Sequence, residues 1–410
     1  MKKDDVRNVL VMGLDIAALA ASAERVGYCP FSVDYFGDQD LRALCVDSLS
    51  VVEQRHGVSC GKLEDEYSPI RFLELARNLQ ESYRLDAALL SSGLEDSQEV
   101  LGELDEIVPI IGNDAKTVQR VRDKTAFFEE LRRLNIPHPQ TSIIADLEEA
   151  RKEAESIGYP VLVKPVRGFG GIGIRKAQNE KELAKVLHAK LPAEGVLIQE
   201  FISGTNISIS FISNTENAEV LSINEQLLGV EQAGQSEPFG YSGTIVPLNV
   251  SKRLEDCCEF ITKRISSHFG LKGSNGLDLV VSGGDKVKVI EVNPRFQATL
   301  ECVETLLGIN LVQAHIDACL EAILPSHVTE NESSVICSRL ILCAKQRSQI
   351  PHLGNLAEIR DVPFPGTIVE KGEPVCSIVV KAKDRGSICE QMYGLIYKIY
   401  RRINADSANL

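Results

Sequence analysis

A lysine and a glycine-rich loop stand between two apolar segments at residues 159–174, and this arrangement constrains the fold of the 410-residue chain more than any other feature. The run Tyr-Pro-Val-Leu-Val-Lys-Pro-Val-Arg-Gly-Phe-Gly-Gly-Ile-Gly-Ile predicts a strand, a loop and a second strand. Glycine permits positive φ and close backbone approach, so the N–H groups of such a loop can fold over phosphate oxygens. The glycines concerned are Gly168, Gly170, Gly171 and Gly173.

Lys164 directly precedes this loop and can bind a phosphate as a point charge. The loop lacks the Gly-Lys-Ser/Thr signature, and a strand rather than a helix is expected after it, which excludes a P-loop. A flexible hairpin loop with an exposed lysine remains the alternative interpretation.

The first hundred residues alternate short apolar runs with helical patterns, which is typical of βαβ units. We expect strands at Val9–Met12, Phe31–Asp34, Ala87–Leu90 and Val108–Ile111, and a helix at Asp15–Val26. The turn after the first strand lacks Gly-x-Gly-x-x-Gly, so a dinucleotide cofactor is not indicated and an oxidoreductase is nearly excluded.

The middle of the chain changes character after a helical stretch at Lys116–Leu134, which two prolines terminate before an extended Thr141–Ile144. Strands dominate from residue 159 to 228. A helix that begins after Ser251 as N-cap carries apolar residues at three- and four-residue spacing, as expected for a helix that covers a sheet.

Two carboxylates and an amide lie on a predicted hairpin formed by Leu277–Val281 and Val287–Val292. Glu291 and Asn293 are two residues apart, so they point to the same face of a strand, and Asp278 can lie beside them. Such an oxygen-rich set suits Mg²⁺ that also binds phosphate oxygens. The alternative is an exposed polar hairpin face without a ligand.

A helix at Leu300–Ile323, an extended Ser333–Lys345 and a tight turn at Val362–Gly366 are expected in the rest of the chain. The chain length favours two or three units. We therefore predict an N-terminal Rossmann-like domain (1–115), a central domain (116–325, divided at 200/201) and a small β-rich C-terminal unit with a terminal helix (326–410), giving an α/β fold with an α+β central part.

The net charge of −14 excludes a diffuse electrostatic attraction to nucleic acid or anionic membranes. The N-terminus does not resemble a signal peptide, and no apolar run is long enough to cross a bilayer, so we expect a cytoplasmic protein. The eleven cysteines are scattered without a metal-binding spacing, and none is assigned a role.

The combined motifs resemble the ATP-grasp superfamily of carboxylate-activating ligases, in the branch with carbamoyl phosphate synthase and biotin carboxylase. Arg122-Asp123-Lys124-Thr125, Lys164 with its glycine loop, Gln199-Glu200-Phe201-Ile202, Asp278 and Glu291-Val292-Asn293-Pro294-Arg295 occur in the order typical of the family over residues 116–300. The resemblance implies an ATP-grasp fold, and it is weaker for residues 360–376, which resemble a small C-terminal unit of such proteins.

The resemblance also implies roles for these residues. Lys124 and Lys164 would bind ATP phosphates under residues 168–173, while Glu200, Phe201 and Ile202 would hold the adenine. Asp278, Glu291 and Asn293 would bind Mg²⁺ or Mn²⁺, and Arg295 would face the reacting oxyanion, with Lys164 beside it as the second catalytic cation. The implied substrates are a small carboxylate and an amine, and a homodimer is left open.

Three positions depart from the family pattern. Asn206 and Ser208 stand where relatives often place an acid that contacts ribose, and Thr299 stands two residues after Gln297, where biotin carboxylase has its glutamate base. The leading hypothesis is therefore an amide-forming ligase that works through an acyl phosphate. The alternatives are a bicarbonate-using or carbamoyl-phosphate-type enzyme and a nucleotide sensor without catalysis. Asp34, Asp38, Asp40 and residues 234–244 are candidates for substrate recognition, and solvated surface is the alternative interpretation of the acidic residues.

Overall fold

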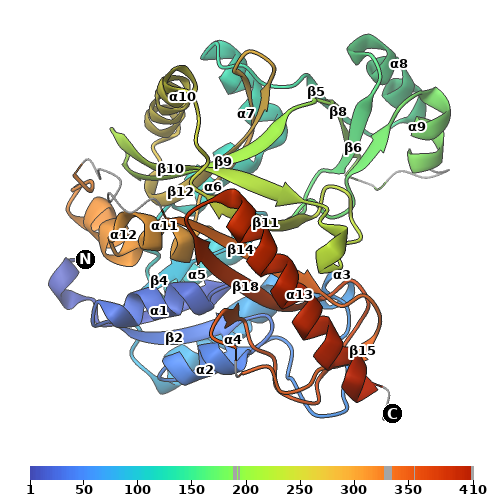
Figure 1. Ribbon diagram of the computed structural model, residues 1–410. Helices are drawn as coiled ribbons and strands as arrows, with labels where there is room; N and C mark the ends of the chain where they lie inside the picture. Colours follow the sequence, from blue (N-terminus) through green and yellow to red (C-terminus); the bar gives the residue numbers. More distant parts are fainter. Residues whose placement is uncertain (188–191, 193, 327–334, 355, 408–410) are drawn as a thin grey trace.

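The computed structural model describes residues 1–187, 192, 194–326, 335–354 and 356–407 (Figure 1). The chain is mixed α/β and contains three main sheets and one two-stranded sheet within these ranges. The α/β class predicted from the sequence is confirmed. No helix in these ranges combines the length and the apolar character that a bilayer crossing requires.

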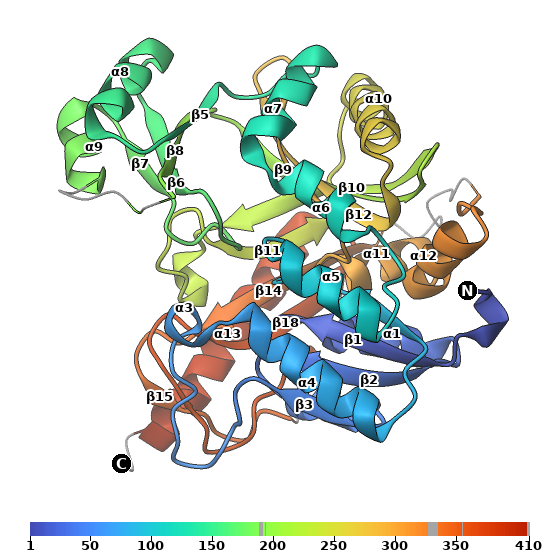
Figure 2. The ribbon, with the colours of Figure 1, turned by 180° about the vertical axis from the view of Figure 1, so that it is seen from behind.

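The N-terminal sheet is parallel, as the βαβ pattern predicts. Its order is β3 (Ser48–Ser50), β2 (Cys29–Asp34), β1 (Asn8–Gly13) and β4 (Ala87–Leu90). Alternate residues of these strands enter two different cores, so both faces are covered. Helix α1 (Ala17–Arg25) lies on one face (Figure 1), and α4 (Pro69–Ser82) and α5 (Gln98–Ile107) lie on the other (Figure 2).

One expected strand of this sheet is absent among the described residues. Val108–Ile111 is not a strand and contributes only a single parallel bridge between Ala88 and Ile110. Four apolar residues can be buried without forming the hydrogen bonds of a strand. Their hydrophobicity therefore indicated burial, and the strand that it also predicted does not form. The remaining short elements of the region are η1 (Lys3–Asp5), α2 (Gln39–Leu44) and α3 (Leu63–Glu66).

A small antiparallel sheet carries the glycine-rich loop between two of its strands. Its order is β5 (Thr141–Ile144), β8 (Val196–Glu200), β6 (Val161–Pro165) and β7 (Arg175–Ala177). Helices α8 (Leu147–Ile157) and α9 (Glu180–Leu187) bury its apolar face. The expected strand, loop and strand around Lys164 are confirmed.

A large antiparallel sheet of eight strands forms the centre of the molecule. In spatial order the strands are β13 (Lys286–Asn293), β12 (Lys272–Ser282), β9 (Thr205–Asn214), β10 (Ala218–Leu228), β11 (Tyr241–Val246), β14 (Ile336–Cys343), β18 (Pro374–Ala382) and β16 (Ile359–Arg360). One face packs under α10 (Lys252–Phe269), where Ile207, Ile209 and Phe211 are buried as their period-two spacing predicts. Ser251 caps α10 through a bond from the backbone N of Leu254.

Two helices predicted as continuous are each divided in two. Asp123 ends α6 (Ala115–Arg122) and caps α7 (Lys124–Arg133) by accepting a bond from the backbone N of Ala126. Gly308, with a left-handed φ of 68°, ends α11 (Leu300–Leu307) before α12 (Leu311–Leu320). In both cases a cap or stop residue within an apolar pattern overrides the helical period.

The C-terminal segment continues the large sheet, because β14 and β18 pair with each other and β14 pairs with β11. The small sheet β15 (Ser348–Gln349) and β17 (Ile368–Val369) and helix α13 (Arg385–Ser407) complete it, together with η2 (Glu231–Ala233) from the preceding segment. The terminal helix is confirmed. The domain boundaries at 115/116 and 325/326 stay predictions.

Candidate functional site

The predicted metal-binding side chains are brought together at the edge of the large sheet. Asp278 on β12 lies directly opposite Glu291 on β13 in the antiparallel register. Asn293 donates from Nδ2 to Asp278 Oδ2 at 3.0 Å, and Gln226 Nε2 donates to Asp278 Oδ1 at 2.9 Å. Asp278 thus has both oxygens engaged by amides that hold its orientation.

Two cations lie over Glu291. Lys124 Nζ donates to Glu291 Oε2 at 2.8 Å, and the Arg122 guanidinium is 3.5 Å from the same oxygen. Burial acts to raise the pKa of Glu291, but the charges of Lys124 and Arg122 outweigh it and hold this pKa well below its usual range. Glu291 is therefore ionised at neutral pH.

The opposite shift occurs at Asp278. Burial, followed by the negative charge of Glu291, raises the pKa of Asp278 to about 7. A divalent cation between the two carboxylates would favour the ionised form of both. A group of three or more His, Cys, Asp or Glu side chains around one metal position is not found within the described ranges.

Lys164 lies near the end of β6, close to this pair. Burial, with a smaller effect of the Lys124 charge, lowers the pKa of Lys164 to about 8, against the attraction of Glu291 and Asp278. The charges of Lys124, Glu291 and Asp278 thus all act on the pKa of Lys164. An anion that approached Lys164 would favour its protonated form.

The glycine loop is held at its start by the N-terminal part of the chain. Gly168 N donates to Asp96 Oδ2 at 3.1 Å, and the Gly168 carbonyl accepts from Arg122 at 3.3 Å. Arg122 and Asp96 are themselves joined by two bonds of 2.7 and 3.0 Å. Phe169 packs edge-on against Tyr67, with ring centroids 5.2 Å apart.

The end of the loop contacts the segment before β11. Tyr241 N donates to the Gly170 carbonyl at 2.8 Å, and Gly173 N donates to Glu237 Oε2 at 3.3 Å. Gly171 approaches this segment so closely that a Cβ there would lie 2.0 Å from the Phe239 carbonyl oxygen. The loop therefore has protein contacts at both of its ends.

Glu200, at the end of β8, is already engaged by other protein groups. Both of its carboxylate oxygens accept from Lys288 Nζ at 2.7 Å, and Gln140 N donates to Oε2 at 3.1 Å. The Lys176 ammonium lies 3.6 Å from the centroid of the Phe201 ring. The assignment of Glu200, Phe201 and Ile202 to an adenine site stays a prediction. The Glu200 carboxylate forms an ion pair with Lys288 on β13 and so joins the small sheet to the large sheet.

Arg295 follows the hairpin and is fixed by an acid that the sequence did not single out. Its Nε donates to Glu95 Oε1 at 2.7 Å, and its Nη2 donates to Asn293 Oδ1 at 3.3 Å. The Glu95 side chain is 9% exposed; burial opposes its charge, but Arg295 and Arg122 hold its pKa below the usual range.

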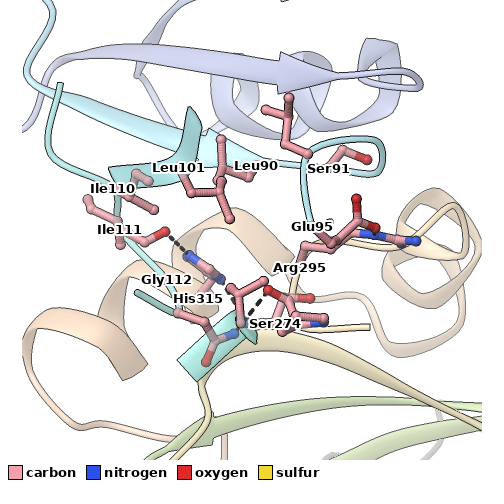
Figure 3. A pocket seen from close by; sticks show the side chains of 14 residues that line it. Leu90, Ser91, Glu95, Leu101, Ile110, Ile111, Gly112, Ser274, Arg295 and His315 are labelled. Atoms are coloured by element: carbon pink, nitrogen blue, oxygen red, sulfur yellow. Dashed lines mark hydrogen bonds and ion pairs between the residues drawn. The ribbon is translucent and has the colours of Figure 1, made fainter. Parts of the chain in front are cut away.

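Arg295 and Glu95 also line a cavity of about 20 Å³ together with His315 (Figure 3). Its other lining residues come from β4 and the loop after it, from α5, from the segment between α5 and α6, from α6, from β12 and from Pro294. This volume is close to that of one water molecule and excludes a nucleotide or a substrate.

One of the three departures from the family pattern, Thr299, belongs to a polar cluster with Ser210, Gln297 and Asn224. Ser210 bonds with Thr299 Oγ1 at 2.9 Å and donates to Gln297 Oε1 at 3.1 Å, while Asn224 Nδ2 donates to Ser210 at 3.1 Å. Thr299 is 5% exposed. The position expected to hold a base in a bicarbonate enzyme thus has a hydroxyl that cannot accept a proton at neutral pH.

The candidate substrate residues of the N-terminal domain have structural partners. Asp34 and Asp38 are buried, and burial raises the pKa of Asp34 to about 7. Asp40 accepts bonds from the backbone N of Asp361 and of Val362, both at 2.9 Å. Asp40 therefore connects the N- and C-terminal segments.

The sequence did not assign a role to five residues that contact the candidate site residues: Glu95, Asp96, Arg122, Gln226 and Lys288. Arg122 could have been found, because it precedes Lys124 within the same motif. The others have no local signal. Glu95 and Asp96 lie in the loop after β4, whereas Gln226 and Lys288 lie on β10 and β13 of the large sheet.

The comparisons with known proteins agree with this arrangement. Residues 121–299 match the model of the ATP-grasp domain. An uncharacterized protein of Methanocaldococcus jannaschii is 23% identical over 94% of this chain and 90% of that protein. The carbamoyl phosphate synthase large chain of Clostridium perfringens is 29% identical over 57% of this chain. The chain spans only about a fifth of that relative's length, 22%.

Solved structures share the fold over nearly the whole chain. Biotin carboxylase of Campylobacter jejuni superposes with a TM-score of 0.72 at 18% identity, covering 94% of this chain and 90% of that one. L-amino acid ligase of Bacillus licheniformis superposes with a TM-score of 0.69 at 16% identity, covering 96% and 97%. Residues 121–299 therefore match an ATP-grasp domain, and the chain shares its fold with these solved structures over nearly its whole length.

Proposed function

We propose that this protein is an ATP-dependent ligase that transfers the γ-phosphoryl group of ATP to a small organic carboxylate, which gives an acyl phosphate and ADP. An amine then attacks the acyl phosphate to form an amide, and inorganic phosphate leaves. One observation carries the proposal. Lys124, Lys164, Asp278, Glu291 and Arg295 converge on one site, although they come from the central helices, the small sheet and the large sheet. Such an arrangement of cations and carboxylates suits phosphoryl transfer, which needs positioning and charge stabilisation.

The nucleotide would lie between the small sheet and the edge of the large sheet. Lys124 and Lys164 would bind the phosphates, with the glycine loop above them. The segment Glu200–Ile202 would contact the adenine with its backbone, because the Glu200 carboxylate is held by Lys288. The side chains of Asn206 and Ser208 would be the nearest groups on β9 for the ribose.

The donor set fits a hard divalent cation. Two carboxylates opposite each other, with an amide oxygen beside them, are the ligands that Mg²⁺ or Mn²⁺ prefers. When bound, the ion would neutralise phosphate charge during transfer. Asn293 would turn its amide oxygen toward the ion, a change that costs it the bond to Asp278.

Arg295 would stabilise the negative charge on the reacting carboxylate. Its guanidinium is oriented by Glu95, a contact that metal binding by Asn293 would leave in place, so it needs little reorganisation. A preorganised cation of this kind is useful only where an anion must react, which is a reason to prefer a catalytic protein over a simple nucleotide sensor.

A carbamoyl-phosphate-type or carboxylating reaction is the second candidate, favoured by the relationship to carbamoyl phosphate synthase and by the fold shared with biotin carboxylase. The buried Thr299–Ser210 contact argues against it, since deprotonation of bicarbonate lacks a base there. An L-amino acid ligase has the same fold, which supports the proposal of an amide-forming reaction.

Release of ADP should be measured with pooled carboxylic acids and amines at fixed magnesium. We expect ADP release that requires an acid, and hydroxylamine in place of the amine should trap the acyl phosphate as a hydroxamate. Release that instead requires bicarbonate, with incorporation of labelled carbon, would favour the second candidate. ATP binding with no turnover under any pool would favour a sensor.

A further inference from the structure

Helix α13 lies on the outside of the large sheet, with no other element in front of it in Figure 1. Its inner side is buried, through residues that include Ile388, Met392, Ile396 and Ile399. These contacts fix the helix against β14 and β18 and leave its opposite side to solvent.

The outer side of α13 exposes two large aromatic rings. Tyr393 is 51% exposed and Tyr397 is 70% exposed. Gly394 lies between them, and a Cβ placed there would meet nothing within 4 Å. Exposed aromatic rings that gather on one face are enriched at protein interfaces, and a glycine beside them lets another backbone approach closely.

Two charged side chains flank the tyrosines on the same face. Glu390 and Arg401 are separated from the tyrosines by three or four residues, so they align with them along the helix. Neither forms an ion pair with any described residue, whereas Arg385 at the start of the helix pairs with Glu225 at 2.8 Å. The charges are opposite in sign and lie at opposite ends of the aromatic pair.

A groove of about 630 Å³ runs beside this face. Its lining includes Tyr393, Tyr397 and Tyr400 from α13 together with Lys345 and Gln346 from the loop after β14. None of its lining residues is acidic. This space is large enough to receive the aromatic ring of another molecule.

We propose that the outer face of α13 docks against the same face of a second copy of this chain, with the two helices antiparallel. Reversal of direction about a two-fold axis sets Glu390 against Arg401 of the partner subunit and Gly394 against Tyr397 of the partner subunit. Lys398 then lies near Tyr393 of the partner subunit, where an ammonium can face an aromatic ring.

Self-complementarity is the reason to choose a second copy as the occupant. In a two-fold contact each surface must be complementary to itself. Glu390 and Arg401 lie at opposite ends of the face, so only the antiparallel direction brings acid against base and Gly394 against Tyr397. The net charge of −14 opposes association at long range, and Lys345, Lys398 and Arg401 add local repulsion where two identical faces meet. Added salt should therefore strengthen the dimer by screening the overall repulsion more than it weakens two exposed ion pairs.

Sedimentation velocity of the full chain over a wide concentration range tests the proposal. We expect a monomer–dimer equilibrium that Tyr397→Glu shifts to monomer, with unchanged circular dichroism and melting temperature. Phe260→Glu is the matched control, because Phe260 is 60% exposed on α10, away from this face. A chain that stays monomeric at all concentrations, or a dimer that Tyr397→Glu leaves intact, would overturn the proposal.

Charge reversal then tests the register. Glu390→Arg or Arg401→Glu alone should each weaken the dimer about 10-fold or more, because like charges then meet twice across the axis. The double variant should return the dissociation constant to within about threefold of the original, since each pair is restored with its signs exchanged. Failure of the double variant to recover would exclude the antiparallel register and with it the proposed interface.

Discussion

At the scale of single residues, Asp278 and Glu291 differ sharply in proton affinity although they face each other across one hairpin. Lys124 and Arg122 lie against Glu291, while Asp278 has only amide partners. The cations therefore favour the ionised form of Glu291, whereas burial disfavours the ionised form of Asp278. A divalent ion would supply the missing positive charge at Asp278.

Replacement of either carboxylate should abolish ATP turnover and leave the fold intact. We expect Asp278→Ala and Glu291→Ala to lower the rate of ADP release on the order of 100-fold or more, because each removes a proposed metal ligand that lies outside the apolar core. Near-normal ADP release at ordinary magnesium would contradict the site assignment. Unchanged circular dichroism serves as the control for folding.

Gln226 is predicted to act through Asp278 as a positioning residue. Gln226→Leu removes the bond to Asp278 Oδ1 and leaves the other candidate ligands in place. We expect the magnesium concentration for half-maximal activity to rise about 10-fold or more, with a smaller change in kcat at saturating magnesium, as is usual for partners of metal ligands. A normal magnesium dependence would mean that Asn293 alone is sufficient to orient Asp278.

Arg295 should be essential for turnover and dispensable for nucleotide binding. Arg295→Ala would also leave the nearly buried Glu95 carboxylate without its ion-pair partner, which destabilises the fold. Loss of activity in this single variant would therefore not separate catalysis from folding. The double variant Glu95→Gln with Arg295→Ala removes that complication. We expect ATP affinity within about threefold of the original by calorimetry and a rate of ADP release lower by about 100-fold; a collapse of affinity would place Arg295 in the phosphate site.

At the scale of elements, the glycine loop offers a matched pair of substitutions. Gly170 and Gly171 have similar positive φ values of 62° and 74°, so alanine strains the backbone at both. Only Gly171 would bring a Cβ against the Phe239 carbonyl, while Gly170 has open space. Gly171→Ala should therefore raise the KM for ATP about 10-fold more than Gly170→Ala. Equal effects of the two variants would exclude a role for this contact.

The sequence predicted the elements that depend on neighbouring residues. It did not predict strand pairings or side-chain contacts between segments that are far apart in the chain. The hairpin of Asp278 and Glu291 follows from alternating residues around a Ser-Gly-Gly-Asp-Lys turn, and its register aligns the two carboxylates as expected. The pairing of β14 with β11 had no local signal, because antiparallel register between strands far apart in sequence depends on the complete sheet. The same limit hid Glu95 and Gln226.

At the scale of the whole molecule, His315 joins three parts of the chain. It lies on α12 and is 3% exposed. Its Nε2 donates to the Ile111 carbonyl at 2.8 Å, and its Nδ1 accepts from the backbone N of Ser274 at 2.7 Å. The ring also packs on Phe296, with centroids 4.4 Å apart. These contacts require a neutral imidazole, because protonated Nδ1 could not accept.

Stability should consequently fall at mildly acid pH. Burial lowers the pKa of His315 to about 4, against the opposing effect of the bond to Ile111, whereas an unfolded histidine titrates near 6.5. The unfolded chain thus takes up a proton before the folded one does, and stability is lost as pH decreases from about 6.5 to about 4. The shift corresponds to about 3 kcal/mol at the end of this window.

Comparison with His315→Gln isolates this contribution from other titrating groups, some of which change with opposite sign. Burial raises the pKa of Asp34, for example, so that carboxyl favours the folded state in acid relative to neutral pH. The variant should be less stable at pH 7.5, since it loses packing on Phe296, but its melting temperature should decline less between pH 6.5 and 4.5. Parallel declines would contradict a buried neutral histidine as the link between the N-terminal sheet and the candidate site.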